Sequence, residues 1–458
     1  MSAPASIGQT PRSTGLLLDL PVPFRQLDGQ LSVESQAHNG LQRWLEHFDA
    51  VTVCAPLIPE DLIDQTLQWQ ALNDLTAPGR LRVEVLPWGY HPGVHFAKVN
   101  GVRRRLRELI ATHQYLCFSN LGWLGSWGNI GAEEAQRAGR PYAVWLDWVL
   151  HEMPRPQRSN PLRTAFDRFS QARLKHHSLR AIRHARLGLF HGRSVYEAYA
   201  PMSRAPHIVH DVHLKPNDLI TEQRLSQRLN RNTGPGHPPL RIGYVGRVHP
   251  MKGPMAWIET LEHLLRQDFG DATHAVPVEA IWLGEGPLLD TARLTIQQQG
   301  MTANVTFAGL ERDRARVLEF FRSLDLFMFC HLTPESPRCL IEALMSGVPL
   351  VGFESAYASD LVAEHGGGTF VKPLDTRALA HELAQLLTLP ELRHSQTRAA
   401  RRSGEAFSDE AVFRHRSELI RNHLRPDAGT SIGVPSGARR GLPYVTESVP
   451  EIGTRPKR

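Results

Sequence analysis

The amino-acid sequence predicts an α/β fold with two parallel sheets, and three observations support this. In the second half of the 458-residue chain, short apolar stretches alternate with stretches of helical period, as in parallel strands connected by helices. The first half shows the same alternation less regularly. A stretch rich in Gly and Pro separates the halves, and a chain of this length can form two full cores. We therefore expect two doubly wound domains.

The expected elements follow from these apolar stretches. In the second half we expect strands at 241–246, 278–284, 305–310, 324–332, 349–354 and 369–371, and helices at 254–267, 287–299, 313–322, 337–346, 356–364 and 375–388. In the first half we expect strands at 15–20, 51–55, 83–86, 115–118, 142–146, 187–190 and 207–209. Crossovers between parallel strands should be right-handed.

Six parts follow along the chain. They are a tail at 1–14, a first domain at 15–223, a linker at 224–239, a second domain at 240–407, a last helix at 408–424 and a second tail at 425–458. The linker is polar and then rich in Gly and Pro. The first tail lacks the apolar core of a signal peptide. In the second tail ten of 34 residues are Gly or Pro, so we expect both tails to be disordered.

Composition narrows the class of protein. Hydrophobic residues make up 41% and charged residues 21%, as in soluble globular proteins, and no apolar run is long enough to span a membrane. The net charge of +6 favours anionic partners such as nucleotide diphosphates or acidic lipids. The four cysteines lack the spacing of a metal or redox site. We expect buried thiols, a cytoplasmic protein and no cofactor or metal.

The stretch 333–352 predicts a binding site for a nucleotide-sugar. Ser336 is a suitable N-cap with Pro337 at the first helical position, and Gly347 fits the left-handed residue after the last turn. Glu335 then lies just outside the helix, with Glu342 two turns further, about 10 Å away on the same face. Free N–H groups at the helix start would attract an anion between them.

A basic loop follows the first strand of the second domain. Residues 246–253 read Gly-Arg-Val-His-Pro-Met-Lys-Gly, so Arg247 and Lys252 lie five residues apart on a loop that enters a helix. Arg binds phosphate bidentately and Lys acts as a point charge. We interpret the loop as a diphosphate clamp, although a basic loop alone is usually solvated surface. The turn at 284–287 is either a plain connection or an approach to the nucleotide.

Four motifs together resemble the group 1 retaining glycosyltransferases of the GT-B fold. They are Gly-Arg-x4-Lys-Gly at 246–253, Leu-Gly-Glu-Gly-Pro at 283–287, Val-Thr-Phe-Ala-Gly at 305–309 and the Pro-Glu-Ser-Pro-Arg-Cys-Leu-Ile-Glu stretch at 334–342. The resemblance covers about residues 241–390. It implies two Rossmann-like domains facing across a cleft, with the nucleotide-sugar on the second domain and the acceptor on the first. It also implies no obligatory metal and a final helix that crosses back to the first domain.

The resemblance assigns roles to individual residues. Arg247 and Lys252 match the pair that binds the diphosphate, and Glu342 matches the glutamate that binds the ribose hydroxyls. Glu335 resembles the glutamate near the donor sugar, but its distance from Glu342 is one residue shorter than in the family. The other residues expected around the donor are Gly246, Leu310, Ser336, Arg338 and Cys339. Of these, Arg338 would add a cation near the phosphates or the donor sugar.

The first half resembles the family only loosely. Gly29 lies where the family has a glycine loop after the first strand. Asp147 ends the strand that carries a histidine toward the donor sugar in many members, and His151 follows four residues later. We expect Asp147 or His151 to have a polar role there, and Asp147 fits a helix N-cap almost as well. Tryptophans at 123, 127, 145 and 148 are either sugar-stacking or core residues.

The stretch 154–186 is strongly basic, with nine Lys or Arg residues and one acid, Asp167. Its first half has apolar residues at helical period. One interpretation is an amphipathic helix on an anionic membrane surface, suited to a lipid-linked acceptor. The other is a helix pair with a solvated basic face. No nucleic-acid-binding motif accompanies the charge.

The function that follows is transfer of a sugar, with retention, from a nucleotide-diphosphate-sugar to a glycan or lipid-linked glycan. The catalytic residues would be Glu335, Asp147, Arg247 and Lys252, acting by charge stabilisation and positioning. Two alternatives remain: a non-catalytic glycan- or nucleotide-binding protein on the same scaffold, and a sugar-nucleotide epimerase, which needs no acceptor. A dehydrogenase is disfavoured because no Gly-x-Gly-x-x-Gly motif follows a strand.

Overall fold

The computed structural model describes residues 13–27, 29–63, 67–75, 79–150, 161–231, 238–266, 277–333 and 335–425. The candidate residue His151 lies outside the described ranges. Both expected tails also lie outside them, apart from residues 13, 14 and 425. Within the described ranges, no helix has the length and apolar character needed to cross a membrane.

The first sheet has seven parallel strands in the order β10-β9-β8-β7-β1-β4-β6. Its strands are β1 (Ser13–Asp19), β4 (Val51–Pro56), β6 (Leu81–Leu86), β7 (His113–Phe118), β8 (Ala143–Leu146), β9 (Leu187–His191) and β10 (Pro206–Val209). The central strands are buried on both faces, as parallel strands covered by helices usually are. All seven strands expected in this half are present, within two residues of the predicted ends.

The second sheet has six parallel strands in the order β13-β12-β11-β14-β15-β16. They are β11 (Leu240–Val245), β12 (Val278–Leu283), β13 (Val305–Gly309), β14 (Leu326–Phe329), β15 (Leu350–Phe353) and β16 (Gly368–Val371). The expected fold class, two doubly wound parallel sheets, is confirmed. The strand expected at 324–332 ends at Phe329 instead, because residues 330–332 form a loop whose Leu332 N–H donates to the carbonyl oxygen of Met251 rather than to a strand.

A small antiparallel sheet, which we did not expect, follows β1. It contains β2 (Arg25–Leu27), β3 (Gln30–Glu34) and β5 (Trp69–Ala71) in the order β2-β3-β5. Gly29, with φ of 76°, lies between β2 and β3, which pair through Leu27 and Gln30. Asp-Gly is common in two-residue hairpin turns, so the sequence at positions 28 and 29 was a hairpin signal that our sequence analysis missed.

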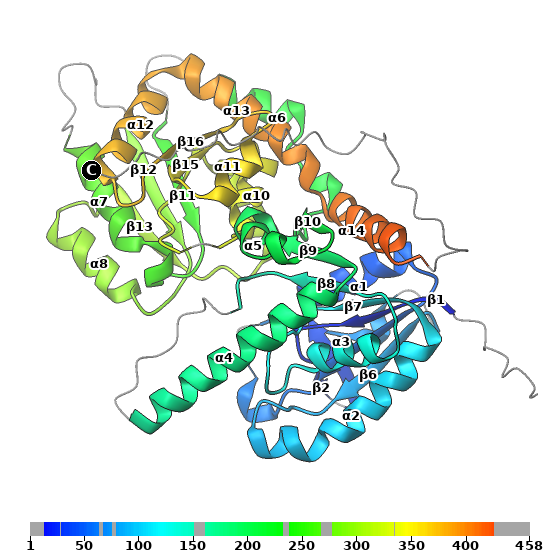
Figure 1. Ribbon diagram of the computed structural model, residues 1–458. Helices are drawn as coiled ribbons and strands as arrows, with labels where there is room; N and C mark the ends of the chain where they lie inside the picture. The colour runs from blue at the N-terminus through cyan, green and yellow to red at the C-terminus, as the bar shows by residue number, and fades with distance from the viewer. Residues whose placement is uncertain are drawn as a thin grey trace, which may run out of the picture. The chain divides into compact units, whose positions relative to one another are not determined.

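Fourteen helices connect and cover the strands among the described residues (Figure 1). They are α1 (Ser35–His47), α2 (Pro92–Thr112), α3 (Trp127–Arg137), α4 (Pro161–His184), α5 (Gly192–Tyr199), α6 (Glu222–Arg231), α7 (Pro254–Leu265), α8 (Leu289–Gln298), α9 (Arg314–Ser323), α10 (Arg338–Met345), α11 (Ala356–Val362), α12 (Thr376–Thr388), α13 (Pro390–Gly404) and α14 (Asp409–His423). Helix α13 was not expected. Below, the N-terminal lobe means β1–β10 with α1–α5, and the C-terminal lobe means β11–β16 with α7–α13.

The residues expected to form a linker begin with helix α6 rather than an extended segment. Three hydrogen bonds fasten α6 to the C-terminal lobe: Arg228 donates to the carbonyl oxygens of Gly347, Ser346 and Arg322 at 2.9, 2.9 and 2.7 Å. Two of these carbonyls follow α10, whose last turn leaves them without helical partners. The Arg228 contacts therefore hold α6 against the C-terminal lobe.

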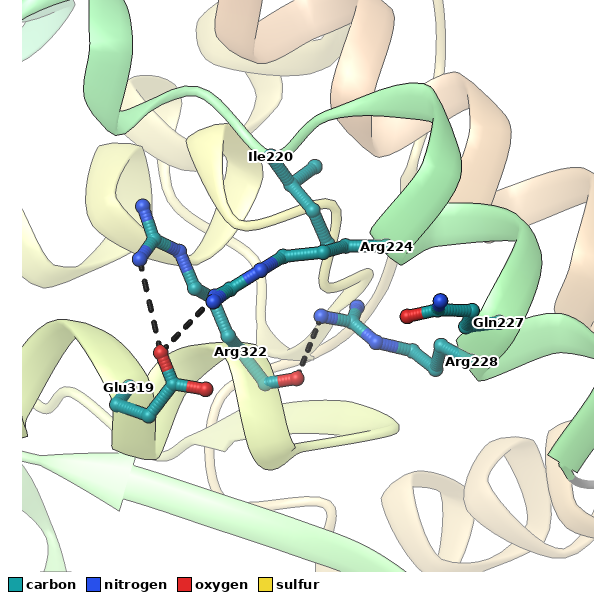
Figure 2. Close-up of a pocket in the computed structure, with 6 residues that line it drawn as sticks. All are labelled: Ile220, Arg224, Gln227, Arg228, Glu319 and Arg322. Carbon is teal, nitrogen blue, oxygen red and sulfur yellow. Dashed lines mark hydrogen bonds and ion pairs between the residues drawn. The ribbon is translucent and has the colours of Figure 1, made fainter.

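Figure 2 shows the pocket of about 370 Å³ between α6 and α9, which is lined by Ile220, Arg224, Gln227, Arg228, Glu319 and Arg322. Arg224 donates to Glu319 at 3.0 Å, and Arg322 lies 3.6 Å from the same carboxylate. Arg322 also donates to the carbonyl oxygen of Asp218. Because protein acceptors bind these guanidinium groups, we interpret the pocket as part of the attachment of α6.

Helix α14 follows the C-terminal lobe in sequence but contacts α1, β7, β9 and β10. Asp409 at its start is fully buried, and its carboxylate lies 3.1 Å from Nε of Arg43 and 3.2 Å from Nδ2 of Asn39. Both partners belong to α1. The last helix therefore packs on the N-terminal lobe, while α6 is fastened to the C-terminal lobe.

Candidate functional site

The loops that follow β11 and β14 meet at the carboxyl edge of the second sheet, where open α/β sheets bind their ligands. The backbone N–H of Leu332 donates to the carbonyl oxygen of Met251 at 2.9 Å. Gly253 has φ of 64°, and a Cβ there would lie 2.0 Å from the carbonyl oxygen of Cys330. Only glycine permits this approach, so the two loops have one fixed arrangement.

This arrangement brings together two of the residues that the sequence singled out. The Nζ atom of Lys252 lies 2.5 Å from Oε2 of Glu335. Both side chains are mostly buried, with exposed fractions of 13% and 22%. The Lys252–Glu335 pair is the best-defined part of the candidate donor site.

His331 lies next to this pair. Its Nε2 atom lies 2.7 Å from the hydroxyl of Tyr244, and its Nδ1 atom lies 3.9 Å from Oε1 of Glu335. Burial, and then the charge of Lys252, hold the pKa of His331 well below its usual value. The imidazole is therefore neutral at pH 7, and Lys252 supplies the positive charge next to Glu335.

Arg247 lies on the same loop, and its side chain is exposed. No hydrogen bond or ion pair joins its guanidinium to the part of the chain that the structure describes. Gly246 and Gly284 are in backbone contact: a Cβ on Gly284 would lie 2.0 Å from the carbonyl oxygen of Gly246. The turn at 284–287 therefore supports the Arg247 loop, which favours the plain structural reading of that turn.

Glu342 lies on α10 and has a partner that the sequence reading missed. Its Oε1 atom accepts a hydrogen bond from Nη2 of Arg314 at 2.8 Å. The Glu342 side chain is 13% exposed and that of Arg314 is 47% exposed. Leu310, four residues before Arg314, is exposed at the carboxyl end of β13. Arg314 begins α9, shortly after β13 ends. Arg247 and Lys252 were singled out by the same kind of position, between a strand and the next helix, so this signal could have identified Arg314.

Helix α10 begins differently from our expectation. Its first residue is Arg338 and its N-cap is Pro337, with no side-chain cap. The hydroxyl of Ser336 instead donates to the carbonyl oxygen of His191 at 3.0 Å. The predicted Ser336 cap is wrong because this tertiary contact takes the hydroxyl. Gly347 is left-handed with φ of 64°, as predicted.

Arg338 contacts the N-terminal lobe. Its Nη2 atom pairs with Oδ2 of Asp211, two residues after β10, and the other oxygen of Asp211 lies 3.2 Å from Nη2 of Arg416. Arg338 and the other neighbouring cations hold the pKa of Asp211 well below its usual value despite its burial. Sequence reasoning missed Asp211 and Arg416, although Asp211 follows a predicted strand, as ligand-binding residues often do.

Asp147 lies after β8, and its Oδ1 atom accepts a hydrogen bond from the indole N–H of Trp145 at 2.8 Å. Burial, and then the neighbouring Asp211, raise the pKa of Asp147. Helix α4 begins at Pro161, so Asp147 is not the N-cap of a described helix. Asp147, Asp211 and Arg338 line a cavity of about 80 Å³ together with residues of α1.

The remaining candidates lie elsewhere or in the core. Gly29 is at the tip of the β2–β3 hairpin, and nothing lies within 4 Å of the position of a Cβ there. Burial raises the pKa of the Cys339 thiol to about 12, so it stays neutral. Trp127 and Trp145 are buried, as the core reading requires. In the described residues, no group of three or more His, Cys, Asp or Glu side chains is arranged to hold a metal ion.

Comparison with known sequences finds similarities that lie mainly in the second lobe. Residues 226–403 match the family model described as "Glycosyl transferases group 1". Protein CapJ of Staphylococcus aureus is 22% identical over 207 residues, which are 45% of this chain and 50% of that protein. D-inositol 3-phosphate glycosyltransferase of Nocardia farcinica is 27% identical over 165 residues, 36% of each chain. The alignments therefore span at most half of these relatives.

Solved structures match nearly the whole chain. The structure of HepE from Anabaena in complex with UDP aligns with a TM-score of 0.60 at 17% identity, covering 89% of this chain and all of HepE. WaaG, a glycosyltransferase involved in lipopolysaccharide biosynthesis, aligns with a TM-score of 0.55 at 14% identity, covering 88% of this chain and 99% of WaaG. Residues 226–403 are therefore similar to the group 1 glycosyltransferases, and the chain has the two-sheet GT-B fold of these structures.

Proposed function

We propose that this protein transfers a sugar, with retention, from a nucleotide-diphosphate-sugar to a hydroxyl of a glycan or lipid-linked glycan. One observation carries the proposal: Lys252, paired with Glu335, and the exposed Arg247 lie on one fixed loop at the carboxyl edge of the second sheet. Two cations at such an edge suit a diphosphate. Similarity to a group 1 family model supports the assignment.

In this proposal the leaving diphosphate is stabilised by charge. Arg247 and Lys252 offset its negative charge as the bond from the anomeric carbon to the phosphate oxygen breaks. The acceptor oxygen bonds to the same face of that carbon, and its proton moves to the diphosphate oxygen. Glu342 binds the ribose hydroxyls, and Glu335 and Asp147 lie toward the donor sugar. No metal is required, because the two side chains provide the positive charge.

The acceptor is proposed to reach the site from the N-terminal lobe, in polysaccharide or glycoconjugate biosynthesis. We further propose that the basic stretch 154–186 contacts an anionic membrane surface on the cytoplasmic side. Arg168, Arg173 and Lys175 of α4 are exposed, and Phe169 is 55% exposed. Over the whole of α4, however, the apolar residues do not gather on one face. Charge therefore supports this contact more than amphipathicity does.

Sedimentation with vesicles tests the membrane contact. At low salt, vesicles that contain anionic lipid should bind the protein, and neutral vesicles should not. Substitution of Arg168, Arg173 and Lys175 by Gln should remove the binding and leave the fold intact. Equal binding to both vesicle types, or none to either, would contradict the contact.

The transfer proposal is tested in two steps. Thermal shifts with UDP, GDP and ADP, and then with their sugars, should identify one base by a rise in apparent stability. UDP and UDP-glucose come first, because HepE was crystallised with both. Release of the nucleoside diphosphate should then depend on an acceptor. Binding without release would favour the non-catalytic alternative, and acceptor-independent conversion of the donor would favour an epimerase.

A further inference from the structure

One cluster of charges joins the two lobes, and no role has been assigned to it. Asp211 of the N-terminal lobe binds two arginines from different elements: Arg338 at the start of α10 and Arg416 in α14. The Asp211 side chain is only 8% exposed, and Arg416 is fully buried. His213 adds a third neighbour, with Nε2 at 3.6 Å from the carboxylate. Segments far apart in the sequence therefore meet at one carboxylate.

A second contact ties the same stretch of the C-terminal lobe to the N-terminal lobe. The hydroxyl of Ser336 donates to the carbonyl oxygen of His191 at 3.0 Å, and Nε2 of His191 lies 3.3 Å from the carbonyl oxygen of Ser336. Gly192 follows with φ of 72°, and a Cβ there would lie 2.5 Å from the Ser336 hydroxyl. The contact between the lobes is therefore close at residue 336 as well as at residue 338.

These contacts surround residues of the candidate donor site. Glu335 immediately precedes Ser336, and its carboxylate lies 2.5 Å from Nζ of Lys252. The segment 335–338 is therefore held from the N-terminal lobe at Ser336 and Arg338, and it holds Lys252 through Glu335. A shift of this segment by about 1 Å would move the Lys252–Glu335 pair and reduce the rate of a reaction that depends on positioning.

The Asp211 contact also changes the role expected for Arg338. A cation at the start of α10 was expected to approach the donor phosphates or sugar. The structure instead pairs its guanidinium with a buried carboxylate of the other lobe. Loss of Arg338 would leave Asp211 with Arg416, which belongs to α14, and would remove the ion pair between Asp211 and the start of α10. The Asp211–Arg338 pair therefore favours the arrangement in which the two lobes are in contact.

We infer that Asp211 and Arg338 are positioning residues, which hold segment 335–338 so that Lys252 and Glu335 are arranged for transfer. This inference rests on the proposed function. It assigns the two residues to the arrangement of the site and not to contact with the donor. The pair would therefore affect turnover more than donor binding, because it determines how often the productive arrangement forms.

The matched control is a second ion pair between the lobes. Arg193 of α5 binds Asp360 of α11 at 2.7 Å, and in the described structure no hydrogen bond or ion pair joins either residue to segment 335–338. Arg338→Gln and Arg193→Gln each remove one ion pair between the lobes. Only the first releases the segment next to Glu335, so a general loosening of the lobes would affect both variants equally.

Two measurements compare these variants. In hydrogen–deuterium exchange without ligand, Arg338→Gln should speed exchange at the amides of 331–337, and Arg193→Gln should not. In steady-state transfer, Arg338→Gln should lower kcat roughly tenfold or more and change the donor KM less than about threefold. Arg193→Gln should keep both within about twofold, and Arg338→Lys should restore part of kcat because it keeps the charge near Asp211.

Three outcomes would overturn the inference. They are equal losses of kcat in the two Gln variants, unchanged exchange at 331–337 in Arg338→Gln, and a raised donor KM with unchanged kcat, which would make Arg338 a donor ligand. Failure of the proposed function itself is visible separately, as absence of transfer by the unaltered protein. In that case the exchange experiment still decides whether the ion pair holds the segment. Asp211→Asn serves as a secondary variant only, since it also leaves Arg416 unpaired.

Discussion

At the scale of single residues, Asp19 is a buried ionisable group outside the candidate site. It ends β1 and is 2% exposed. Its Oδ2 atom accepts a hydrogen bond from the backbone N–H of Asn120 at 2.9 Å. A Cβ on Gly128 would lie 2.3 Å from the same oxygen, so only glycine leaves room for the carboxyl group. Burial raises the pKa of Asp19 to about 7.

This pKa predicts a pH dependence of stability. Between about pH 4 and pH 7 the folded protein retains a proton on Asp19 that the unfolded chain releases, so the free energy of unfolding falls as the pH rises. Asp19→Asn should remove this fall. Its stability relative to the unaltered protein should be roughly 2 kcal/mol more favourable at pH 8 than at pH 5.

Urea unfolding at the two pH values measures this difference. The exposed Asp61→Asn is the control and should show no such change. Of the neighbouring groups, Cys117 has a pKa raised by burial to about 12, and that of Cys54 is raised well above its usual value. The two thiols therefore do not titrate in this range. A constant difference between Asp19→Asn and the unaltered protein would contradict the assignment.

Arg314 allows a second prediction for a single residue. If Glu342 binds the donor ribose, its ion pair with Arg314 at 2.8 Å orients the carboxylate. Arg314→Ala should raise the donor KM about two- to fivefold with little effect on kcat, since partly exposed pairs contribute at most about 1 kcal/mol. Steady-state kinetics with varied donor measures this. A lower KM in the variant would mean that Arg314 competes with the ribose for Glu342.

At the scale of elements, the close contact between the loops after β11 and β14 determines where Lys252 lies. Gly253 has φ of 64°, and a Cβ there would lie 2.0 Å from the carbonyl oxygen of Cys330. Gly300 has a similar φ of 69°, but nothing lies within 4 Å of its Cβ position. Substituting Gly300 therefore tests the cost of the left-handed backbone alone. Substituting Gly253 tests that cost together with the clash between the two loops.

Gly300→Ala should destabilise the protein by about 1 kcal/mol, the cost of a left-handed conformation for a residue with a Cβ. Gly253→Ala should cost about 3 kcal/mol or more, because the added Cβ also forces the two loops apart. Gly253→Ala should lower transfer as well, whereas Gly300→Ala should not. Thermal or urea unfolding and a transfer assay compare the two variants. Equal effects would contradict the role of close approach.

The same scale shows which elements the sequence could predict. Buried parallel strands are short apolar runs, so all thirteen were expected within about three residues. The hairpin strands β2 and β3 were missed because they are short and only partly buried. The predicted Ser336 N-cap was wrong because the Ser336 hydroxyl donates to the carbonyl oxygen of His191 instead. A capping rule that considers only neighbouring residues cannot predict such a tertiary contact. The polar stretch predicted as a linker begins instead with α6, which Arg228 attaches to carbonyl groups of the C-terminal lobe.

At the scale of the whole molecule, local motifs predicted the donor side of the site but not its contact with the N-terminal lobe. Arg247, Lys252, Glu335 and Glu342 belong to two short motifs, and the structure pairs Lys252 with Glu335. Asp211 and Arg338, by contrast, are 127 residues apart. No local pattern links them, because their meeting depends on how the two lobes pack.

Metal removal tests the electrostatics of the whole site. Because Arg247 and Lys252 provide the positive charge in the proposed reaction, transfer should persist in excess EDTA. The assay compares initial rates with EDTA, with added Mg²⁺ and with neither. Loss of transfer in EDTA, with recovery on addition of Mg²⁺, would contradict the proposed role of the two side chains.

The most direct test of the account is transfer by a variant with both Lys252→Ala and Glu342→Ala. The account predicts a fall of roughly a hundredfold or more in acceptor-dependent release of the nucleoside diphosphate, with the fold retained by circular dichroism. The control is Lys372→Ala with Glu364→Ala, two exposed residues of the same lobe that belong to neither loop; this variant should keep its activity. Turnover at the rate of the unaltered protein in the Lys252–Glu342 double variant would contradict the site assignment.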